Sequence, residues 1–249
     1  MLDDSRLKIS VIGSGNVAFH LMKAWSVAAD VTQVPPRTLE GLPDDSDIYI
    51  ISVSDNAIAG VASRLCHLPG IVAHTSGTTP MSVLSEAGVQ RPGVLYPLQT
   101  FSREVPLDYS EIPVFIEGCD DGVADTLQRA AAMWSGSVTR CSSDTRCKIH
   151  LASVLACNFT NHLWTLAEQL LAGDAIPFGI LKPLIRQTAA KIERVSPQEA
   201  QTGPARRHDT RTIARHLEMA AGNPRLKQIY ALLSQSISDA YPENSANPL

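Results

Sequence analysis

The sequence predicts an α/β fold in which a doubly wound parallel sheet is followed by an all-helical C-terminal domain. In the first part of the chain, short β-rich runs alternate with segments of helical periodicity, which is typical of a parallel sheet covered by helices. From residue 143 onward only helical spacing is found. The 249 residues are enough for two modest domains, and we expect them at residues 1–142 and 143–249.

Seven short segments are strand candidates. Several are apolar throughout, as expected for strands that helices cover on both faces. The candidates are Leu7–Ile12, Asp30–Val34, Ile48–Val53, Gly70–Thr75, Gly93–Tyr96, Pro113–Glu117 and Ser137–Cys141.

Helical segments occupy most of the connections between these strands. We expect them at Val17–Ala28, Asn56–Cys66, Pro80–Ala87 and Gly122–Trp134. The connection from Val34 to Ile48 differs, because it contains three prolines and a glycine. A loop or a single turn is therefore expected there in place of a crossover helix.

The C-terminal domain has the spacing of four helices. They are expected at Thr145–Ala172, Phe178–Val195, Thr210–Ala221 and Pro224–Tyr241. Asp209 and Asn223 stand directly before the last two and are suited to cap them. The loop Thr202–Asp209 carries two arginines and a histidine, which either bind an anionic group or are simply solvated.

Composition excludes several classes of function. The formal net charge is −4 and the basic residues are scattered, so we expect no nucleic-acid partner. No apolar run approaches the ~20 residues of a membrane helix, and the acidic N-terminus lacks the pattern of a signal peptide. The five cysteines are odd in number and form no CxxC pair, which favours reduced structural thiols, a cytoplasmic location and no metal site.

A glycine-rich turn follows the first strand and opens the first helix. Gly13 permits a tight turn there, and Gly15 has no side chain to keep a diphosphate from the amides of the helix. We therefore predict a dinucleotide site formed by Gly13, Ser14, Gly15, Asn16 and Val17. The alternative is a tight turn that binds no ligand.

The residues after the second strand bear on the choice of dinucleotide. An Asp or Glu about 20 residues after the glycines would bind the ribose hydroxyls of NAD, but the segment Gln33–Thr38 contains neither. Arg37 can instead pair with a 2′-phosphate. This favours NADP over NAD, unless Arg37 is only a solvated loop residue.

Two serines lie where the third and fourth strands end. Because ligands bind beyond the carboxyl ends of parallel strands, Ser54 and Ser76 are expected to border the nicotinamide end of the cofactor. Asp55 is expected to cap the helix that begins near Asn56. His74 is either a hydrogen-bonded residue at a strand end or a group that orients a substrate.

A polar stripe interrupts the first helix of the C-terminal domain. On an α-helix His150, Cys157 and Asn161 fall within about 20° of one line, with Ser153 and Asn158 beside them. These side chains bind neighbouring helices or line a cleft between the domains. In the second case His150 is a candidate general acid, while Asn158 and Asn161 would orient the substrate.

Several of these segments together resemble a known family. They are the glycine turn, His74–Gly77 (HTSG), Leu95–Ser102 (LYPLQTFS), the helix with Asn158 and Asn161, and the loop Thr202–Asp209 (TGPARRHD). They are similar to bacterial Rossmann-like oxidoreductases with a C-terminal domain of unknown function. That family is related to pyrroline-5-carboxylate reductase, to 6-phosphogluconate dehydrogenase and to deazaflavin-dependent NADP oxidoreductases.

The resemblance implies an N-terminal NAD(P)-binding domain and a helical C-terminal domain, similar to that of 6-phosphogluconate dehydrogenase, that forms a homodimer. We expect an NADP-dependent oxidoreductase that transfers a hydride between nicotinamide and a small carbonyl or imine substrate in the interdomain cleft. The alternative is a non-catalytic NAD(P)-binding sensor or regulatory dimer. A nucleotide-free scaffold or a methyltransferase-like protein fits the glycine motif and Arg37 less well.

Overall fold

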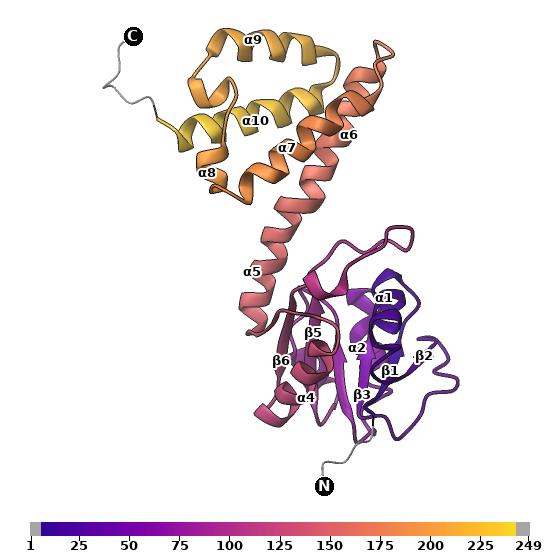
Figure 1. Ribbon diagram of the computed structural model, residues 1–249. Helices are drawn as coiled ribbons and strands as arrows, with labels where there is room; N and C mark the ends of the chain where they lie inside the picture. The colour runs from indigo at the N-terminus through magenta and orange to yellow at the C-terminus, as the bar shows by residue number, and fades with distance from the viewer. Residues whose placement is uncertain (1–5, 243–249) are drawn as a thin grey trace. The chain divides into compact units, whose positions relative to one another are not determined.

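The computed structural model describes residues 6–242 and divides into two compact units, residues 1–160 and 161–249 (Figure 1). The change from alternating to purely helical structure predicted after residue 142 coincides with the start of helix α5 (Ser143–Ser153). The boundary between the two compact units lies further along the sequence, after residue 160. The domain limits 1–142 and 143–249 therefore stay a prediction.

The first unit contains a seven-stranded sheet in the order β2-β1-β3-β4-β5-β6-β7. All seven predicted strands are present. Those in the middle of the sheet are almost wholly buried between the helices, whereas the edge strands Asp30–Val34 and Val138–Arg140 are largely exposed. The strands are β1 (Lys8–Ile12), β2 (Asp30–Val34), β3 (Ile48–Ile51), β4 (Ile71–His74), β5 (Pro92–Pro97), β6 (Val114–Gly118) and β7 (Val138–Arg140).

The predicted parallel sheet is confirmed except at one pair of strands. Strand β6 runs antiparallel to β5, with Tyr96 opposite Phe115, whereas every other neighbouring pair of strands is parallel. The segment between β5 and β6 contains only the short 3₁₀ turn η2 (Tyr109–Glu111). A reversal of direction needs no crossover helix, so this connection suffices.

Helices cover both faces of the sheet, as the doubly wound arrangement requires. One face buries Leu21 and Trp25 of α1 together with Leu127 of α4, and the other buries Ile58 and Leu84 of α2 and α3. The connection from β2 to β3 contains no helix, as predicted. The helices are α1 (Asn16–Trp25), α2 (Ile58–Ala62), α3 (Ser82–Glu86) and α4 (Asp121–Ala132).

The second unit is helical. Three of the four predicted helices lie in it, whereas the predicted helix Thr145–Ala172 begins in the first unit and is interrupted at Val154–Phe159. Asp209 accepts a hydrogen bond from the Thr212 amide at 3.0 Å and Asn223 one from the Leu226 amide at 3.1 Å, so both caps are confirmed. The short α8 was not predicted. The helices are α6 (Thr160–Ala172), α7 (Lys182–Ile192), α8 (Pro197–Ala200), α9 (Thr210–Met219) and α10 (Pro224–Ala240).

The Gly-Pro loop before α9 makes internal contacts. The Arg206 guanidinium lies 4.3 Å from the centroid of the Tyr241 ring, and the His208 ring binds the Tyr241 carbonyl. Two of the three basic side chains of this loop therefore hold the end of α10. Within residues 6–242 no helix combines the length and apolarity of a membrane span, and no group of His, Cys, Asp and Glu is placed to hold a metal ion.

Candidate active site

A cavity of about 1170 Å³ lies at the carboxyl ends of the central strands, within the first unit. It brings together turns that are far apart in the sequence, as expected at the point where the strand order reverses. Its walls include Ser14–Val17, Pro36–Arg37, Ser52–Asp55, Thr75–Gly77, Tyr96–Phe101 and residues from Ile149 to Asn158. Nearly all of the predicted site residues line it: Ser14, Gly15, Asn16, Val17, Arg37, Ser54, Ser76, His150 and Asn158.

The two glycines of the first turn differ in the space that surrounds the position of a Cβ. A Cβ on Gly13, whose φ is +156°, would lie 2.1 Å from the Ser52 carbonyl oxygen, so the absence of a side chain lets β1 approach the end of β3. A Cβ on Gly15 would meet no atom of the described residues within 4 Å. No contact with residues 6–242 accounts for Gly15, and the space beside it opens into the cavity next to the first amides of α1.

The loop that carries Arg37 is fixed by a second arginine. Arg64, in the turn after α2, donates hydrogen bonds to the carbonyls of Pro36, Arg37 and Thr38 at 3.2, 2.9 and 3.0 Å. The Arg37 side chain is exposed and borders the cavity. Sequence reasoning missed Arg64, because its partners are backbone atoms of a loop 26 to 28 residues away.

The turns after β3 and β4 are linked by a hydrogen bond. Ser76 is buried and its hydroxyl accepts from the amides of Thr78 and Thr79, at 3.2 and 2.9 Å. The prediction that Asp55 caps a helix is wrong. Its carboxylate instead accepts a hydrogen bond from the Thr78 hydroxyl at 2.8 Å, because the two turns lie side by side at the sheet edge.

The segment Leu98–Arg103 is held against the glycine turn. The Asn16 side chain donates to the Phe101 carbonyl at 2.9 Å, and Arg103 donates to the Ser14 carbonyl. Behind them the buried His20 bonds through one ring nitrogen to the Ser102 carbonyl and through the other to the Tyr109 hydroxyl, both at 3.0 Å. This part of the LYPLQTFS motif therefore forms a wall of the candidate cofactor site.

His74 is placed behind the cavity, and not among the residues that line it. It is fully buried, and its Nδ1 accepts a hydrogen bond from the Ser76 amide at 3.2 Å. Burial, together with the positive charge of Arg146, lowers the pKa of His74 to about 4. The ring is therefore neutral near pH 7 and shapes the turn that carries Ser76, which favours the structural interpretation.

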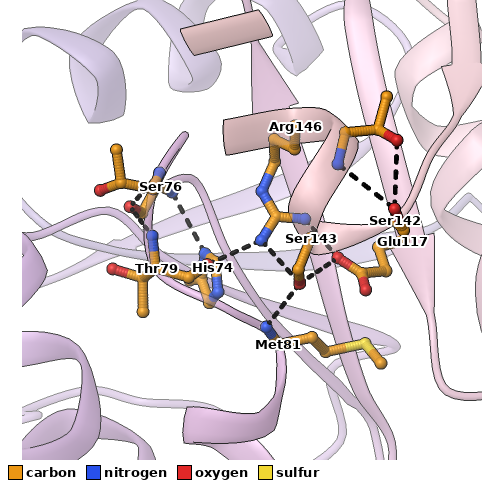
Figure 2. Close-up of polar contacts among 10 residues, drawn as sticks. His74, Ser76, Thr79, Met81, Glu117, Ser142, Ser143 and Arg146 are labelled. Atoms are coloured by element: carbon orange, nitrogen blue, oxygen red, sulfur yellow. Dashed lines mark hydrogen bonds and ion pairs between the residues drawn. The ribbon is translucent and has the colours of Figure 1, made fainter. Parts of the chain in front are cut away.

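A buried ion pair anchors the start of α5 (Figure 2). Arg146, with 1% of its side chain exposed, pairs with Glu117 of β6 and donates to the Thr79 carbonyl at 2.7 Å. The Ser143 hydroxyl donates to Glu117 at 2.8 Å and accepts from the Met81 amide at 3.1 Å. These contacts fix the first turn of α5 and so set the position of His150 one turn later.

His150 meets the buried Tyr96 inside the cavity. The Tyr96 hydroxyl lies 3.0 Å from His150 Nδ1, and burial raises the pKa of this tyrosine. Gly77 packs against both rings, since a Cβ there would lie 2.5 Å from His150 Nδ1 and 2.9 Å from Tyr96 Cζ. Sequence analysis named neither Tyr96 nor Gly77 as a site residue, although both belong to motifs that it singled out.

A π-helical segment, η3 (Val154–Phe159), continues α5 and forms one wall of the cavity. It supplies Ala156, Cys157 and Asn158. A π-helix has i→i+5 hydrogen bonds and therefore turns by less than 100° per residue. The polar stripe predicted for a regular α-helix is thus not kept beyond this segment. Asn161, in α6, is not among the cavity-lining residues, and its role stays a prediction.

Comparisons with known proteins agree with this architecture. A candidate NADP oxidoreductase from Bacteroides fragilis shares 34% identity over 94% of this chain and 98% of its own, with a TM-score of 0.85. A reductive aminase from Aspergillus terreus, solved with NADPH and ethyl levulinate, shares 12% identity over 95% of this chain and 94% of its own, with a TM-score of 0.66.

A pyrroline carboxylate reductase from Plasmodium falciparum, solved with NADP bound, shares 10% identity over 95% of this chain and 98% of its own, with a TM-score of 0.55. The likeness to the aminase and to this reductase is one of fold. Among curated proteins no match is found. The family model described as a domain of unknown function, DUF2520, matches residues 112–237. The chain therefore belongs to the DUF2520 family, and it has the two-part fold of Rossmann-type oxidoreductases that the sequence predicted.

Proposed function

We propose that this protein is an NADP-dependent oxidoreductase that transfers a hydride between nicotinamide and a small carbonyl or imine compound. The observation that carries the proposal is the 1170 Å³ cavity, because it joins the open amides beside Gly15 to Arg37 and to His150. A dinucleotide site and a candidate proton donor thus share one space. The NADP oxidoreductase relative from Bacteroides fragilis, at 34% identity, supports the same assignment.

The residues present fit the dinucleotide. The amides from Ser14 to Val17 would hold the diphosphate at the positive end of α1. Ser54 and Ser76 would border the ribose and nicotinamide. When bound, NADPH supplies the hydride.

At the substrate end of the cavity, the substrate would be bound by the imidazole of α5 and by side-chain amides of the helical segments that follow it. His150 would donate a proton to the substrate oxygen or nitrogen, and Asn158 would orient that atom by hydrogen bonding. Asn161 is proposed to assist in orienting the substrate. The alternative of a non-catalytic sensor predicts binding of NADPH without its oxidation by any member of a panel of aldehydes, ketones and imines.

Arg37 decides the cofactor preference in this proposal. We expect Arg37→Ala to weaken NADPH binding by roughly 10- to 100-fold, since a charge-assisted hydrogen bond contributes about 1.5–3 kcal/mol. NADH binding should not change, because NADH lacks the 2′-phosphate. Calorimetric titration of both nucleotides measures this, with the exposed Arg129→Ala of α4 as the matched control. A variant that keeps the wild-type preference for NADPH contradicts the assignment.

We further propose that the helical unit forms a homodimer. Among residues 161–242 the buried hydrophobic residues are only Leu166, Ala205 and Ala220. Large apolar residues of this unit are instead more than half exposed: Leu170, Ile180, Leu184, Ile192, Met219 and Leu232. A second copy of the chain, with the same helices, would cover such surface.

Light scattering should give twice the 26.8 kDa of one chain. Leu184→Glu combined with Leu232→Glu should shift the mass toward that of the single chain, because each change places a charge on the apolar surface. The matched control is Glu168→Gln with Glu218→Gln, which alters exposed charged positions of the same unit. A wild-type protein with the mass of one chain at micromolar concentration contradicts the dimer.

A further inference from the structure

We infer that Tyr96 is a positioning residue that holds His150 with its proton on Nε2, the form that can donate to a substrate in the cavity. The catalytic role of this arrangement rests on the proposed function, whereas the arrangement of the two side chains is independent of it. Both side chains line the cavity, Tyr96 from β5 and His150 from α5, and they meet at 3.0 Å.

The chemistry of the two groups selects the direction of their hydrogen bond. A phenol O–H is a stronger acid than the N–H of a neutral imidazole, and the bare imidazole nitrogen is the stronger base. Burial raises the pKa of Tyr96, so the hydroxyl keeps its proton at neutral pH. A buried hydroxyl also needs an acceptor. Tyr96 therefore donates to Nδ1, which leaves the proton of the neutral ring on Nε2.

The surroundings keep the two rings in this arrangement. Gly77 gives them room on one side, because a single added carbon would lie 2.5 Å from His150 Nδ1. Ser153 donates its hydroxyl proton to the His150 carbonyl at 2.7 Å. Arg146, one turn before His150, is tied to the sheet through Glu117. The imidazole is thus supported by α5, by the turn after β4 and by β5.

A neutral imidazole fixed in this way presents its Nε2–H to the cavity as a hydrogen-bond donor. A proton that leaves Nε2 is replaced at Nδ1 by the Tyr96 proton, so the ring stays neutral. This Nε2–H can donate to the oxygen of a carbonyl or the nitrogen of an imine while the hydride adds to the neighbouring carbon. Without the Tyr96 hydroxyl, Nδ1 loses its partner, and the ring is free to rotate or to carry its proton on either nitrogen. The expected loss is therefore in the chemical step and not in cofactor binding.

The ring nitrogens can be observed directly by long-range ¹H–¹⁵N NMR at neutral pH, with His150→Gln to assign the signals. In the wild type, Nε2 should be protonated and Nδ1 unprotonated and shifted by its hydrogen bond. Tyr96→Phe should abolish that shift. Tyr109→Phe is the matched control, because Tyr109 makes the equivalent 3.0 Å bond to His20, and it should move the His20 signals alone.

Two NMR results would overturn the inference. One is a wild-type His150 with its proton on Nδ1, and the other is a His150 spectrum that does not respond to Tyr96→Phe while the variant stays folded. Both can be read whether or not the protein turns over a substrate, so they are separate from the test of the proposed function.

Kinetics with an active substrate supply the catalytic readout. Tyr96→Phe should lower kcat roughly 10- to 100-fold, part of what general acid catalysis contributes, and leave the NADPH dissociation constant unchanged. His150→Gln should lose at least as much, and the double variant no more than His150→Gln alone, because both act through one proton donor. Additive losses would mean that Tyr96 acts independently of His150, against the inference.

Discussion

Replacing Arg146 by methionine should lower the free energy of unfolding by about 3–5 kcal/mol, because it leaves the Glu117 carboxylate without its buried partner. Only 1% of the Arg146 side chain is exposed, and 16% of that of Glu117. The change also removes a hydrogen bond to the Thr79 carbonyl. Urea denaturation followed by circular dichroism measures the loss.

The protein contains a matched control for this substitution. Arg140 pairs with Asp121 and Asp125, but 40% of its side chain is exposed and those carboxylates are largely solvated. Arg140→Met should therefore cost no more than about 1 kcal/mol. The double variant Arg146→Met with Glu117→Leu should regain part of the loss, since no buried charge is left unpaired. Equal effects of Arg146→Met and Arg140→Met would contradict the assigned role of the buried pair.

Replacing Gly15 by aspartate should weaken NADPH binding by at least about 100-fold, or about 2.7 kcal/mol, without unfolding the protein. Gly15 precedes α1 with φ −75° and ψ −176°, a conformation open to any residue. In the part of the chain that the structure describes, no atom lies within 4 Å of the place of its missing Cβ. Aspartate is a favourable residue at this capping position. Its negative charge would nevertheless repel a diphosphate at the same amides.

Two further variants separate the effect of charge from the effects of size and of packing. Gly15→Asn has the size of aspartate without its charge, so it should weaken binding less. Gly13→Ala should instead lower the melting temperature, because its methyl group would lie 2.1 Å from the Ser52 carbonyl oxygen. Calorimetric titration and thermal unfolding of the three variants give both quantities. Wild-type affinity in Gly15→Asp would place the diphosphate elsewhere.

Much of the fold could be predicted from local sequence patterns. The buried strands are short apolar runs, such as Ile48–Ile51, and the caps Asp209 and Asn223 stand directly before their helices. The direction of β6 was not predicted, although no helical pattern lies between Tyr96 and Pro113 and a parallel neighbour of β5 would need a crossover helix there. The cap assigned to Asp55 failed because its partner, Thr78, is distant in the sequence.

In the candidate site, too, features with a local sequence motif could be predicted, and features that depend on distant residues could not. The glycine turn and Arg37 belong to motifs with known spacing, and they line the cavity. Arg146 has the sequence context of an exposed helical residue, and only the fold brings it to Glu117, 29 residues away. The predicted polar stripe assumes 100° per residue, which the π-helical segment η3 does not keep, so Asn158 lines the cavity and Asn161 does not.

Titration of the wild-type protein with NADPH, followed by calorimetry, tests the central claim most directly. The account predicts saturable binding of one NADPH per chain, weaker binding of NADH, and loss of the NADPH signal in Gly15→Asp. Folded wild-type protein that releases no heat with NADPH, and whose melting temperature NADPH does not raise, would contradict it.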